Sequence, residues 1–255
     1  MILFLQATMQ GLALGAVYSL VAIGLVLIYK ATDVLSFAQP ALAVAGAGII
    51  SAFAIDRGLP FWLSMILGVL FTGFLSLIIE RTFLRPMVGE PVFSVAILTI
   101  GIDILLRTVL DNWIGLNPRY LGDPFPNFGN FGSLTINGVT LKYLEITAFF
   151  TAILVIILLS IFFKKSKYGV AMRATSFDQE AALAQGIDVG KIFGLVWFIA
   201  GILASLAGFF ITGGFNTLTQ FSFISALRAL PAVVIGGLAL HSPVVVLVFN
   251  FSFAL

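Results

Sequence analysis

The sequence predicts an all-α integral membrane protein, a polytopic helix bundle of about seven spans with one or two broken or re-entrant helices. Of its 255 residues, 60% are hydrophobic and 9% are charged, whereas about 25% of the residues of a soluble domain are charged. The mean hydropathy is +1.15, and the apolar residues gather in runs of roughly 20, the length that a helix needs to cross a bilayer. We expect residues 1–255 to form a single transmembrane domain.

The composition also excludes several kinds of chemistry. The chain has no cysteine and a single histidine, His241, which excludes disulfides, thiolate chemistry and a metal site built from several histidines. No nucleophile with a neighbouring base is apparent, and the phosphate-binding pattern Gly-x-x-x-x-Gly-Lys-Ser/Thr is absent. We therefore expect no catalytic residue, no metal or cofactor and no ATP hydrolysis by this chain. The net charge of +2 gives no indication of nucleic-acid binding.

The apolar runs that can span a membrane are residues 5–29, 34–55, 61–79, 91–110, 143–163, 192–214 and 229–251. The first run has no basic segment before it and no small-residue cleavage site after it, so we expect it to remain as a span. Segment 111–142 is rich in Gly, Pro and Asn, which predicts an irregular external loop. Within it, Asn137-Gly138 favours a small hairpin.

The basic residues predict the orientation, because short cytoplasmic loops carry an excess of Lys and Arg. If loop 164–191 is cytoplasmic, alternation of the spans gives that side Lys30, Arg81, Arg85, Lys164, Lys165, Lys167, Arg173 and Lys191. The opposite side receives Arg57, Arg119 and Lys142, while Arg107 and Arg228 fall within spans. This imbalance predicts a cytoplasmic loop 164–191 and an external N-terminus.

Small residues recur at four-residue spacing in two of the runs. They are Gly11, Gly15 and Ser19 in the first run, and Gly201, Ala204, Ser205 and Gly208 in the sixth. Such spacing lets helix backbones approach closely in lipid, where hydrophobicity gives helices no reason to associate. We expect a compact bundle, and a contact with a second subunit through one of these stripes is an alternative.

Two proline positions suggest interrupted helices. Pro40 follows the polar residues Ser36 and Gln39, and Pro231 opens the last run after the polar segment 216–220. Transporters often place such discontinuities in corresponding positions of two repeats to build a substrate site, and segments 37–48 and 223–237 could form such a pair. The alternative is two uninterrupted helices with proline in the first turn.

The polar loop 164–191 predicts a short capped helix. Ser176 and Gln179 have the spacing of a capping box, Asp178 and Glu180 suit the first turn, and Gly186 suits the left-handed position after the last turn. We expect a helix over 177–185, about 13 Å long at roughly 1.5 Å per residue. Phe177, Ala181 and Ala184 would share one face, which predicts docking on a partner; an interfacial helix on lipid headgroups is disfavoured by the acidic residues.

Ionisable residues inside a membrane are candidates for function. Asp103 and Arg107 are four residues apart in the fourth run, where they can form an ion pair on one helix face. Both a structural pair and a role beside a translocation path stay open. Ser36, Gln39 and Thr99 are neutral hydrogen-bonding groups suited to a path for a zwitterion.

Several motifs together resemble a known family. Glu180-Ala181-Ala182 followed by Gly186 resembles the "EAA…G" loop of bacterial ABC importer permeases, which docks in a cleft of the cytoplasmic ATPase. Further motifs resemble permeases of branched-chain amino acid importers, over about residues 5–238: segments 15–25, 28–29, 85–86, 99–101, 168–174 and 230–237.

The chain departs from that family pattern in two places. The family usually has Asn-Phe-Ala-His-Gly, or Gln in place of the His, where this chain has Ser36-Phe37-Ala38-Gln39-Pro40. After Gly237 the Gly-rich continuation is replaced by 238–243 and an apolar tail to Leu255. We therefore expect a chain that is about one span shorter than the family pattern, a truncated form.

The resemblance implies a permease subunit of an ATP-driven importer for branched-chain or other hydrophobic amino acids in the bacterial inner membrane. It implies ATPase-coupling residues Gly169, Arg173, Glu180, Ala181, Ala182 and Gly186. For the translocation path, Ser36, Gln39, Thr99, Asp103 and Arg107 are the candidates. The implied partners are cytoplasmic ATPase subunits that bind ATP and Mg²⁺, a second permease that is identical or homologous, and an external substrate-binding protein.

Two alternatives are kept. One is the same importer class carrying urea or short amides. The other is an ion-coupled secondary transporter, which would depend on Asp103 as its membrane carboxylate and would leave the capped helix unexplained.

Overall fold

The computed structural model describes residues 2–114, 118–121, 132–136, 139–213, 217–219 and 222–236. Within these residues, six helical segments are long and apolar enough to cross a membrane: Ile2–Thr32, Gln39–Asp56, Phe61–Met87, Val92–Trp113, Tyr143–Lys165 and Val189–Gly213. They correspond to the first six predicted runs, which confirms a polytopic all-α membrane protein. Most of the seventh run, 229–251, lies outside the described residues.

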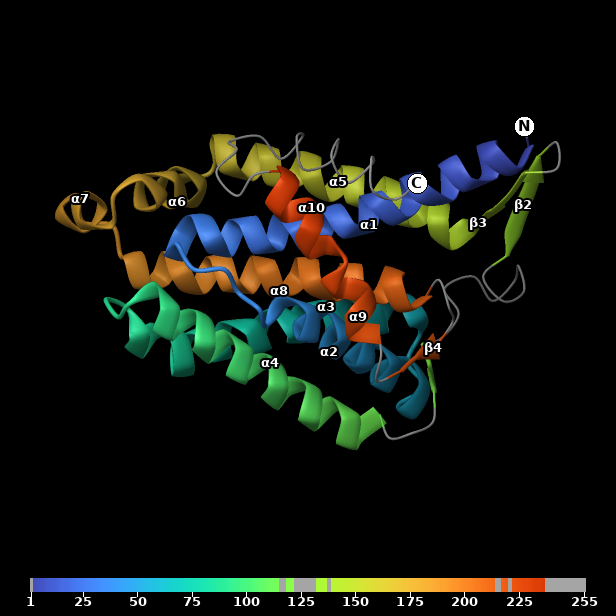
Figure 1. Ribbon diagram of the computed structural model, residues 1–255, viewed down its shortest axis with the longest axis horizontal. Coiled ribbons are helices and arrows are strands. Elements are labelled where there is room, and N and C mark those ends of the chain that lie inside the picture. Colours follow the sequence, from blue (N-terminus) through green and yellow to red (C-terminus); the bar gives the residue numbers. More distant parts are fainter. Residues whose placement is uncertain are drawn as a thin grey trace.

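Helix α8 (Val189–Gly213) is the centre of the bundle. It packs against α1 (Ile2–Thr32), α2 (Gln39–Ser51) and α3 (Phe61–Ile79), as Figure 1 shows. A Cβ at Gly201 would lie 2.6 Å from Ser76 Cβ and 2.8 Å from the Thr72 carbonyl oxygen. A Cβ at Gly208 would overlap the Ala43 carbonyl group. The predicted close packing along 201–208 is therefore confirmed.

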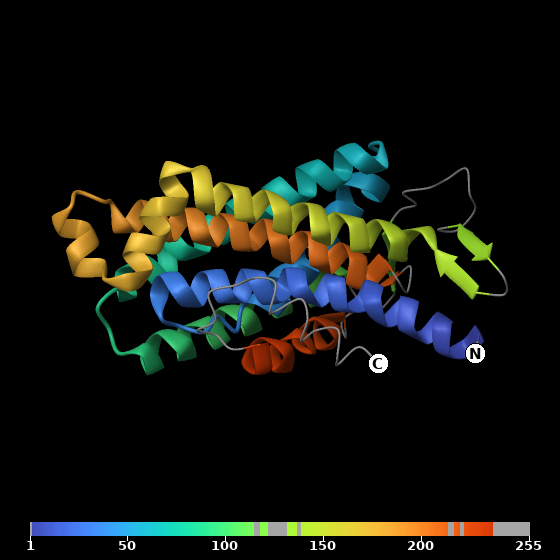
Figure 2. The same ribbon diagram turned by 90° about the horizontal axis from the view of Figure 1, so that it is seen from above.

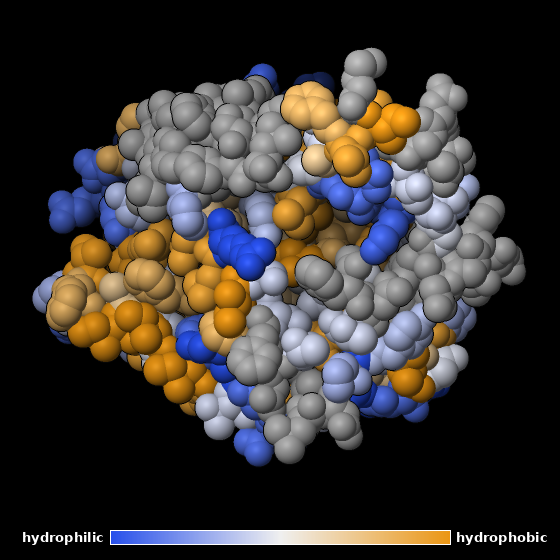
Figure 3. All heavy atoms as spheres, turned by 45° about the vertical axis from the view of Figure 1, so that its right-hand side comes forward, coloured by the Kyte–Doolittle hydropathy of each residue, from blue (hydrophilic) through white to orange (hydrophobic). Residues whose placement is uncertain are grey.

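Helices α4 (Val92–Ile114) and α5 (Tyr143–Lys165) flank this core and are mostly exposed. The side chains that they and α3 present outward are large and apolar, for example Phe71, Phe74, Phe93, Ile104, Phe150 and Leu154. On the face drawn in Figure 3, hydrophobic residues form broad patches and hydrophilic residues gather between them. A surface of this kind suits contact with lipid.

The run 34–55 begins with non-helical residues, and Pro40 lies in the first turn of α2, as in the alternative prediction. Residues 33–38 are not helical and Asp33 has a φ of 55°, so α1 ends at Thr32 and the chain turns back. In Figure 1 this segment returns toward the middle of the bundle, where α2 begins at Gln39 with Pro40 in its first turn. Helix α2 has only 13 residues and continues as a π-helical turn, Ala52–Asp56.

The second interrupted segment comprises two short helices, α9 (Ser222–Leu227) and α10 (Ala229–Gly236). The interruption lies at Arg228, and Pro231 falls in the first turn of α10. Segments 37–48 and 223–236 thus each contain a helix with proline in its first turn, whereas Gly237 lies outside the described residues.

One end of the bundle carries the strands, and we call it the hairpin end. Strands β2 (Ser133–Ile136) and β3 (Val139–Lys142) pair antiparallel with Ile136 opposite Val139, so the predicted hairpin is present. The two-residue strands β1 (Arg119–Tyr120) and β4 (Thr217–Leu218) also pair antiparallel. Figures 1 and 2 place the N-terminus at this end as well.

The opposite end is formed by α6 (Lys167–Phe177) and α7 (Gln179–Ala184), and we call it the α7 end. The sequence predicted a short helix over 177–185; the structure has it over Gln179–Ala184, so the predicted start is wrong by two residues, because the preceding helix α6 continues to Phe177. In Figures 1 and 2, α6 and α7 project beyond the ends of α1 and α8. The π-helical turn Glu80–Leu84 and the 3₁₀ turn Arg85–Met87 extend α3 at the same end.

Candidate functional site

Helix α6 is held close to the end of α5. Ser166 separates the two helices, and its Oγ accepts a hydrogen bond from the Tyr168 backbone N–H at 3.2 Å. A Cβ at Gly169 would lie 2.6 Å from both the Phe162 carbonyl oxygen and the Phe163 Cα. Gly169, a candidate coupling residue, is therefore needed for the sharp turn from α5 into α6.

The cap of α7 differs from the predicted one. Asp178 has extended backbone, with a φ of −158°, and its Oδ1 accepts from the Ala181 N–H at 2.9 Å. Ser176 instead lies in the last turn of α6, where its hydroxyl donates to the Arg173 carbonyl at 2.9 Å. Because α6 continues to Phe177, Ser176 is helical and cannot cap the next helix. Its predicted partner Gln179 reaches α1, donating to the Ala31 carbonyl at 3.4 Å.

The end of α7 is as predicted. Gly186 has a φ of 81°, the left-handed conformation that favours glycine. The Ile187 N–H donates to the Ala182 carbonyl at 3.0 Å and the Gly186 N–H donates to the Leu183 carbonyl at 2.9 Å, which is a Schellman motif. The chain therefore turns sharply from α7 toward α8.

The residues of α7 divide between an inner and an outer side. Ala182 is buried, while Glu180, Ala181 and Ala184 are exposed, as is Arg173 on α6. Phe177, which the sequence placed on the same helix face, lies at the end of α6 and is 80% exposed. The outer side of α7 thus presents two alanines, Leu183 and one carboxylate, next to the exposed aromatic ring of Phe177.

Asp188 caps the start of α8. Its Oδ1 accepts from the Lys191 N–H at 3.0 Å, and its Oδ2 lies 3.0 Å from Lys191 Nζ. These interactions, above all the side-chain hydrogen bond from Lys191, hold the pKa of the Asp188 carboxyl below its ordinary value. The α7–α8 connection is therefore fixed at both ends, by Gly186 and by Asp188.

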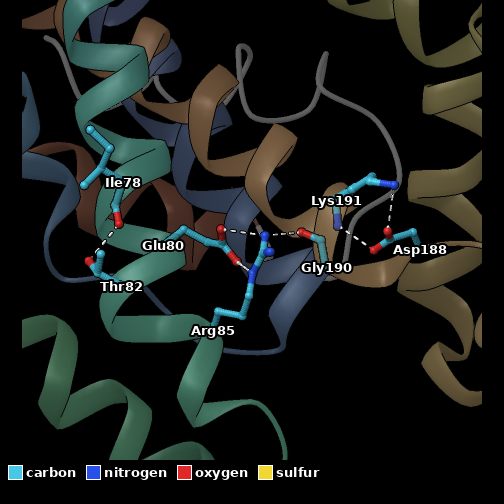
Figure 4. Close-up of polar contacts among 7 residues, drawn as sticks. All are labelled: Ile78, Glu80, Thr82, Arg85, Asp188, Gly190 and Lys191. Atoms are coloured by element: carbon cyan, nitrogen blue, oxygen red, sulfur yellow. Dashed lines mark hydrogen bonds and ion pairs between the residues drawn. The ribbon is translucent and has the colours of Figure 1, made fainter.

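An ion pair beside this connection was not recognised in the sequence (Figure 4). Arg85 donates to both carboxylate oxygens of Glu80, from Nε at 3.2 Å and from an amino nitrogen at 3.1 Å. The same amino nitrogen donates to the Gly190 carbonyl at 2.7 Å. Glu80 is 1% exposed. The sequence did contain a signal for this pair, because Glu80 and Arg85 follow directly on one apolar run.

A cavity of about 80 Å³ lies next to the pair. Its walls include Thr32, Glu80, Arg85, Gln179, Phe193 and Trp197. These residues come from α1, the extension of α3, α7 and α8. The cavity therefore lies at the α7 end, between the end of α1, the turn after α3 and the start of α8.

Three candidate path residues lie around the interruption before α2. Thr99 Oγ1 accepts from the Phe37 N–H at 3.2 Å and donates to the Ala96 carbonyl at 2.8 Å. Gln39 Nε2 donates to the Ala200 carbonyl at 3.0 Å. Ser36, Gln39 and Thr99 are fully buried, and the described residues offer no hydrogen-bond partner to Ser36 Oγ or Gln39 Oε1. Buried polar atoms are thus present where α4, α8 and the interrupted segment meet.

The other two candidates form a separate group. Asp103 and Arg107 make the predicted ion pair, and the Arg107 guanidinium lies 4.4 Å from the centre of the Phe223 ring. The pair therefore connects α4 to α9, nearer the hairpin end than Thr99 is. The structure does not bring all five path candidates to one place.

Comparison with known proteins places the chain in a family. Residues 7–255 match the family described as "Branched-chain amino acid transport system / permease component". The chain is 25% identical over 244 residues to the high-affinity branched-chain amino acid transport system permease protein BraD of Pseudomonas aeruginosa, covering 92% of this chain and 80% of BraD.

Two further relatives are named for different substrates. The probable branched-chain amino acid transport permease protein LivH of Methanocaldococcus jannaschii is 29% identical over 232 residues, 86% of this chain and 73% of LivH. The fructose import permease protein FruF of Bifidobacterium longum is 26% identical over 238 residues, 89% of this chain and 61% of FruF. With its family match over almost the whole chain and its polytopic helix bundle, this protein belongs to the permease components of branched-chain amino acid transport systems, as a transporter subunit and not an enzyme.

Proposed function

We propose that this chain forms part of the membrane pathway of an ATP-driven importer for branched-chain or other hydrophobic amino acids. The observation that carries the proposal is the family match over residues 7–255. Relatives named for branched-chain amino acids support the amino-acid substrate. FruF makes a sugar the alternative that must be tested.

In this proposal α6 and α7 form the coupling element that docks on a cytoplasmic ATPase. The outer side of α7 supports this role, because Glu180, Ala181 and Ala184 are exposed at the tip of the molecule. A six-residue helix is too short to be stable alone, and here Asp178 and the Schellman turn at Gly186 fix both of its ends. Such a fixed element can enter a cleft of a partner and transmit its movement.

The orientation follows from the basic residues. All eight Lys and Arg residues predicted for the cytoplasm are in parts of the described elements that lie at the α7 end. Lys30, Lys164 and Lys191 are examples, each at the end of a long helix. Arg57, Arg119 and Lys142 lie at the hairpin end. The positive-inside rule then places the α7 end in the cytoplasm and the N-terminus and segment 111–142 outside, in a bacterial inner membrane.

The partners follow from the same arrangement. The ATPase subunits bind ATP and Mg²⁺ and contact α7; a second permease, identical or homologous, completes the pathway. A substrate-binding protein delivers the amino acid at the hairpin end. Inside the membrane, the buried Ser36, Gln39 and Thr99 supply hydrogen bonds to the passing substrate, and the Asp103–Arg107 pair lies beside the same route.

The test is reconstitution of the chain with its ATPase, permease and binding-protein partners in proteoliposomes. We expect ATP-dependent uptake of leucine, isoleucine or valine, and none of fructose or urea. Uptake of fructose or urea alone would overturn the substrate assignment. Uptake driven by an ion gradient without ATP would overturn the importer class and favour a secondary transporter.

The coupling element is tested in the same system with Glu180→Arg. A cation on the outer side of α7 should abolish co-purification of the ATPase and reduce ATP-driven uptake at least tenfold. Glu90→Arg is the control, because Glu90 is an exposed carboxylate at the same end and makes the same change of charge. Retention of the ATPase by Glu180→Arg would contradict the docking role of α7.

A further inference from the structure

The Glu80–Arg85 pair depends on an uncommon turn at the end of α3. Glu80–Leu84 form a π-helical turn, and the Arg85 N–H donates to the Glu80 carbonyl. Hydrogen bonds between residues five apart bring residues i and i+5 close to the same side of the helix. Arg85 therefore lies beside the carboxylate of Glu80 and can donate to both of its oxygens.

The third contact of Arg85 links distant parts of the chain. Gly190 is in the first turn of α8, directly after α7, and is 105 residues away from Arg85 in the sequence. Glycines allow this approach: a Cβ at Gly194 would lie 2.8 Å from Leu77 Cδ1 and 3.3 Å from Glu80 Oε2. The start of α8 is thus packed directly against the end of α3.

The remaining connections of α7 to the bundle are weaker. The hydrogen bond from Gln179 to the Ala31 carbonyl is 3.4 Å long, and the Gln179 side of α7 faces the same cavity as Glu80 and Arg85. By contrast, α7 runs into α8 through the fixed turn at Gly186 and the cap at Asp188. Movement of α7 is therefore passed to the start of α8 through this turn, and to α6 through Asp178.

We propose that Glu80 and Arg85 are positioning residues that make the turn between α3 and α4 move together with the α7–α8 connection. This inference rests on the proposed function, in which an ATPase displaces α7. Glu80 holds the Arg85 guanidinium, and the guanidinium holds the Gly190 carbonyl, so the buried Glu80 and the partly exposed Arg85 join the end of α3 to the start of α8. Loss of the pair leaves α7 able to bind the ATPase but unable to move α3 and α4.

The first experiment compares Arg85→Gln with Arg81→Gln in the reconstituted importer. Arg81 lies in the same turn and is exposed, and within the described residues it makes no hydrogen bond or ion pair. We expect Arg85→Gln to keep the bound ATPase and its hydrolysis, and to reduce the substrate transported per ATP at least tenfold. Arg81→Gln should match the unchanged protein. An unchanged ratio in Arg85→Gln would overturn the proposal.

A double variant separates positioning from simple loss of stability. Arg85→Gln alone leaves a buried carboxylate without its partner, which disfavours the fold. Glu80→Gln/Arg85→Gln removes both charges, so we expect its thermal stability to recover while the transport per ATP stays low. Recovery of transport together with stability would mean a structural role only. Absence of a bound ATPase in the unchanged protein would instead refute the proposed function.

A distance measurement gives a readout that is independent of activity. Because the chain has no cysteine, spin labels at Thr82→Cys and Gln185→Cys report the separation of the two segments, and both positions are exposed. We expect this distance to stay constant between the ATP-free and ATP-bound importer, and to change or broaden when Arg85→Gln is added. A change of the distance in the protein with intact Arg85 would overturn the joint movement.

Discussion

At the scale of single residues, the ends of the short helices decide how the α7 end is built. Both Ser176 and Asp178 have the chemistry of an N-cap, and the sequence alone does not distinguish them. The close packing of α6 on α5 at Gly169 lets α6 continue to Phe177, which leaves Asp178 as the cap. By contrast, the left-handed conformation of Gly186 was predictable from the sequence. Glycine adopts this conformation without steric cost, so the residue type alone indicates it.

The cap of α8 predicts a pH dependence. Since hydrogen bonds from Lys191 lower the pKa of Asp188 in the folded protein, the ionised carboxylate stabilises the fold above its ordinary pKa. This stabilisation is lost as the pH falls through the lowered pKa. We expect the difference in melting temperature between the unchanged protein and Asp188→Asn to be full at pH 7 and to disappear in acid.

Lys191→Gln is the companion variant, because the Lys191 side chain gives the largest of these interactions. In detergent-solubilised protein at pH 7, Asp188→Asn should lower the melting temperature less when Lys191→Gln is already present. A difference that persists unchanged well below the ordinary pKa of aspartate would contradict this account of the cap.

At the scale of helices, the sequence predicted the existence and most bounds of the spans. A run of about 20 apolar residues is the length that crosses a bilayer, and such runs rarely form any other structure. The sequence also offered a helix with Pro40 in its first turn as one of two alternatives, and α2 has this form. It did not predict the Glu80–Arg85 pair. That pair requires the π-helical turn at Glu80–Leu84 and the approach of Gly190, and both depend on tertiary packing rather than on local residue types.

The glycine contacts between helices give a second prediction. Gly208→Ala places a methyl group against the Ala43 carbonyl on α2, and overpacking of this kind costs about 1–3 kcal/mol. Gly101→Ala on α4 is the matched control, since nothing lies within 4 Å of its Cβ position. We expect a lower melting temperature for Gly208→Ala and little change for Gly101→Ala; equal effects would show that α2 and α8 can move apart at little cost.

At the scale of the whole molecule, the distribution of charge was predictable from the chain and the positions of the path residues were not. Counting Lys and Arg in loops requires only the order of the spans. Ser36 and Gln39 lie near Thr99 because of where α2 begins. Asp103 and Arg107 lie beside α9 because of how that helix returns to the bundle. Neither position can be read from the order of residues in the chain.

The orientation is testable with single cysteines. A membrane-impermeant maleimide applied to intact cells should label Ser133→Cys at the hairpin end and leave Gln185→Cys beside α7 unlabelled until the cells are opened. Both positions are exposed in the folded chain, so burial does not explain a missing signal. Labelling of Gln185→Cys in intact cells would reverse the topology.

The tight packing along α8 also divides the protein into parts with different mechanical roles. Helix α8 is interlocked with α3 at Gly201 and with α2 at Gly208, where a methyl group would overlap the neighbouring helix. Packed interfaces of this kind switch between discrete arrangements rather than deform gradually. We expect the middle parts of α2, α3 and α8 to stay together during transport, so that relative movement is confined to the helix ends, where Arg85 joins the end of α3 to the start of α8.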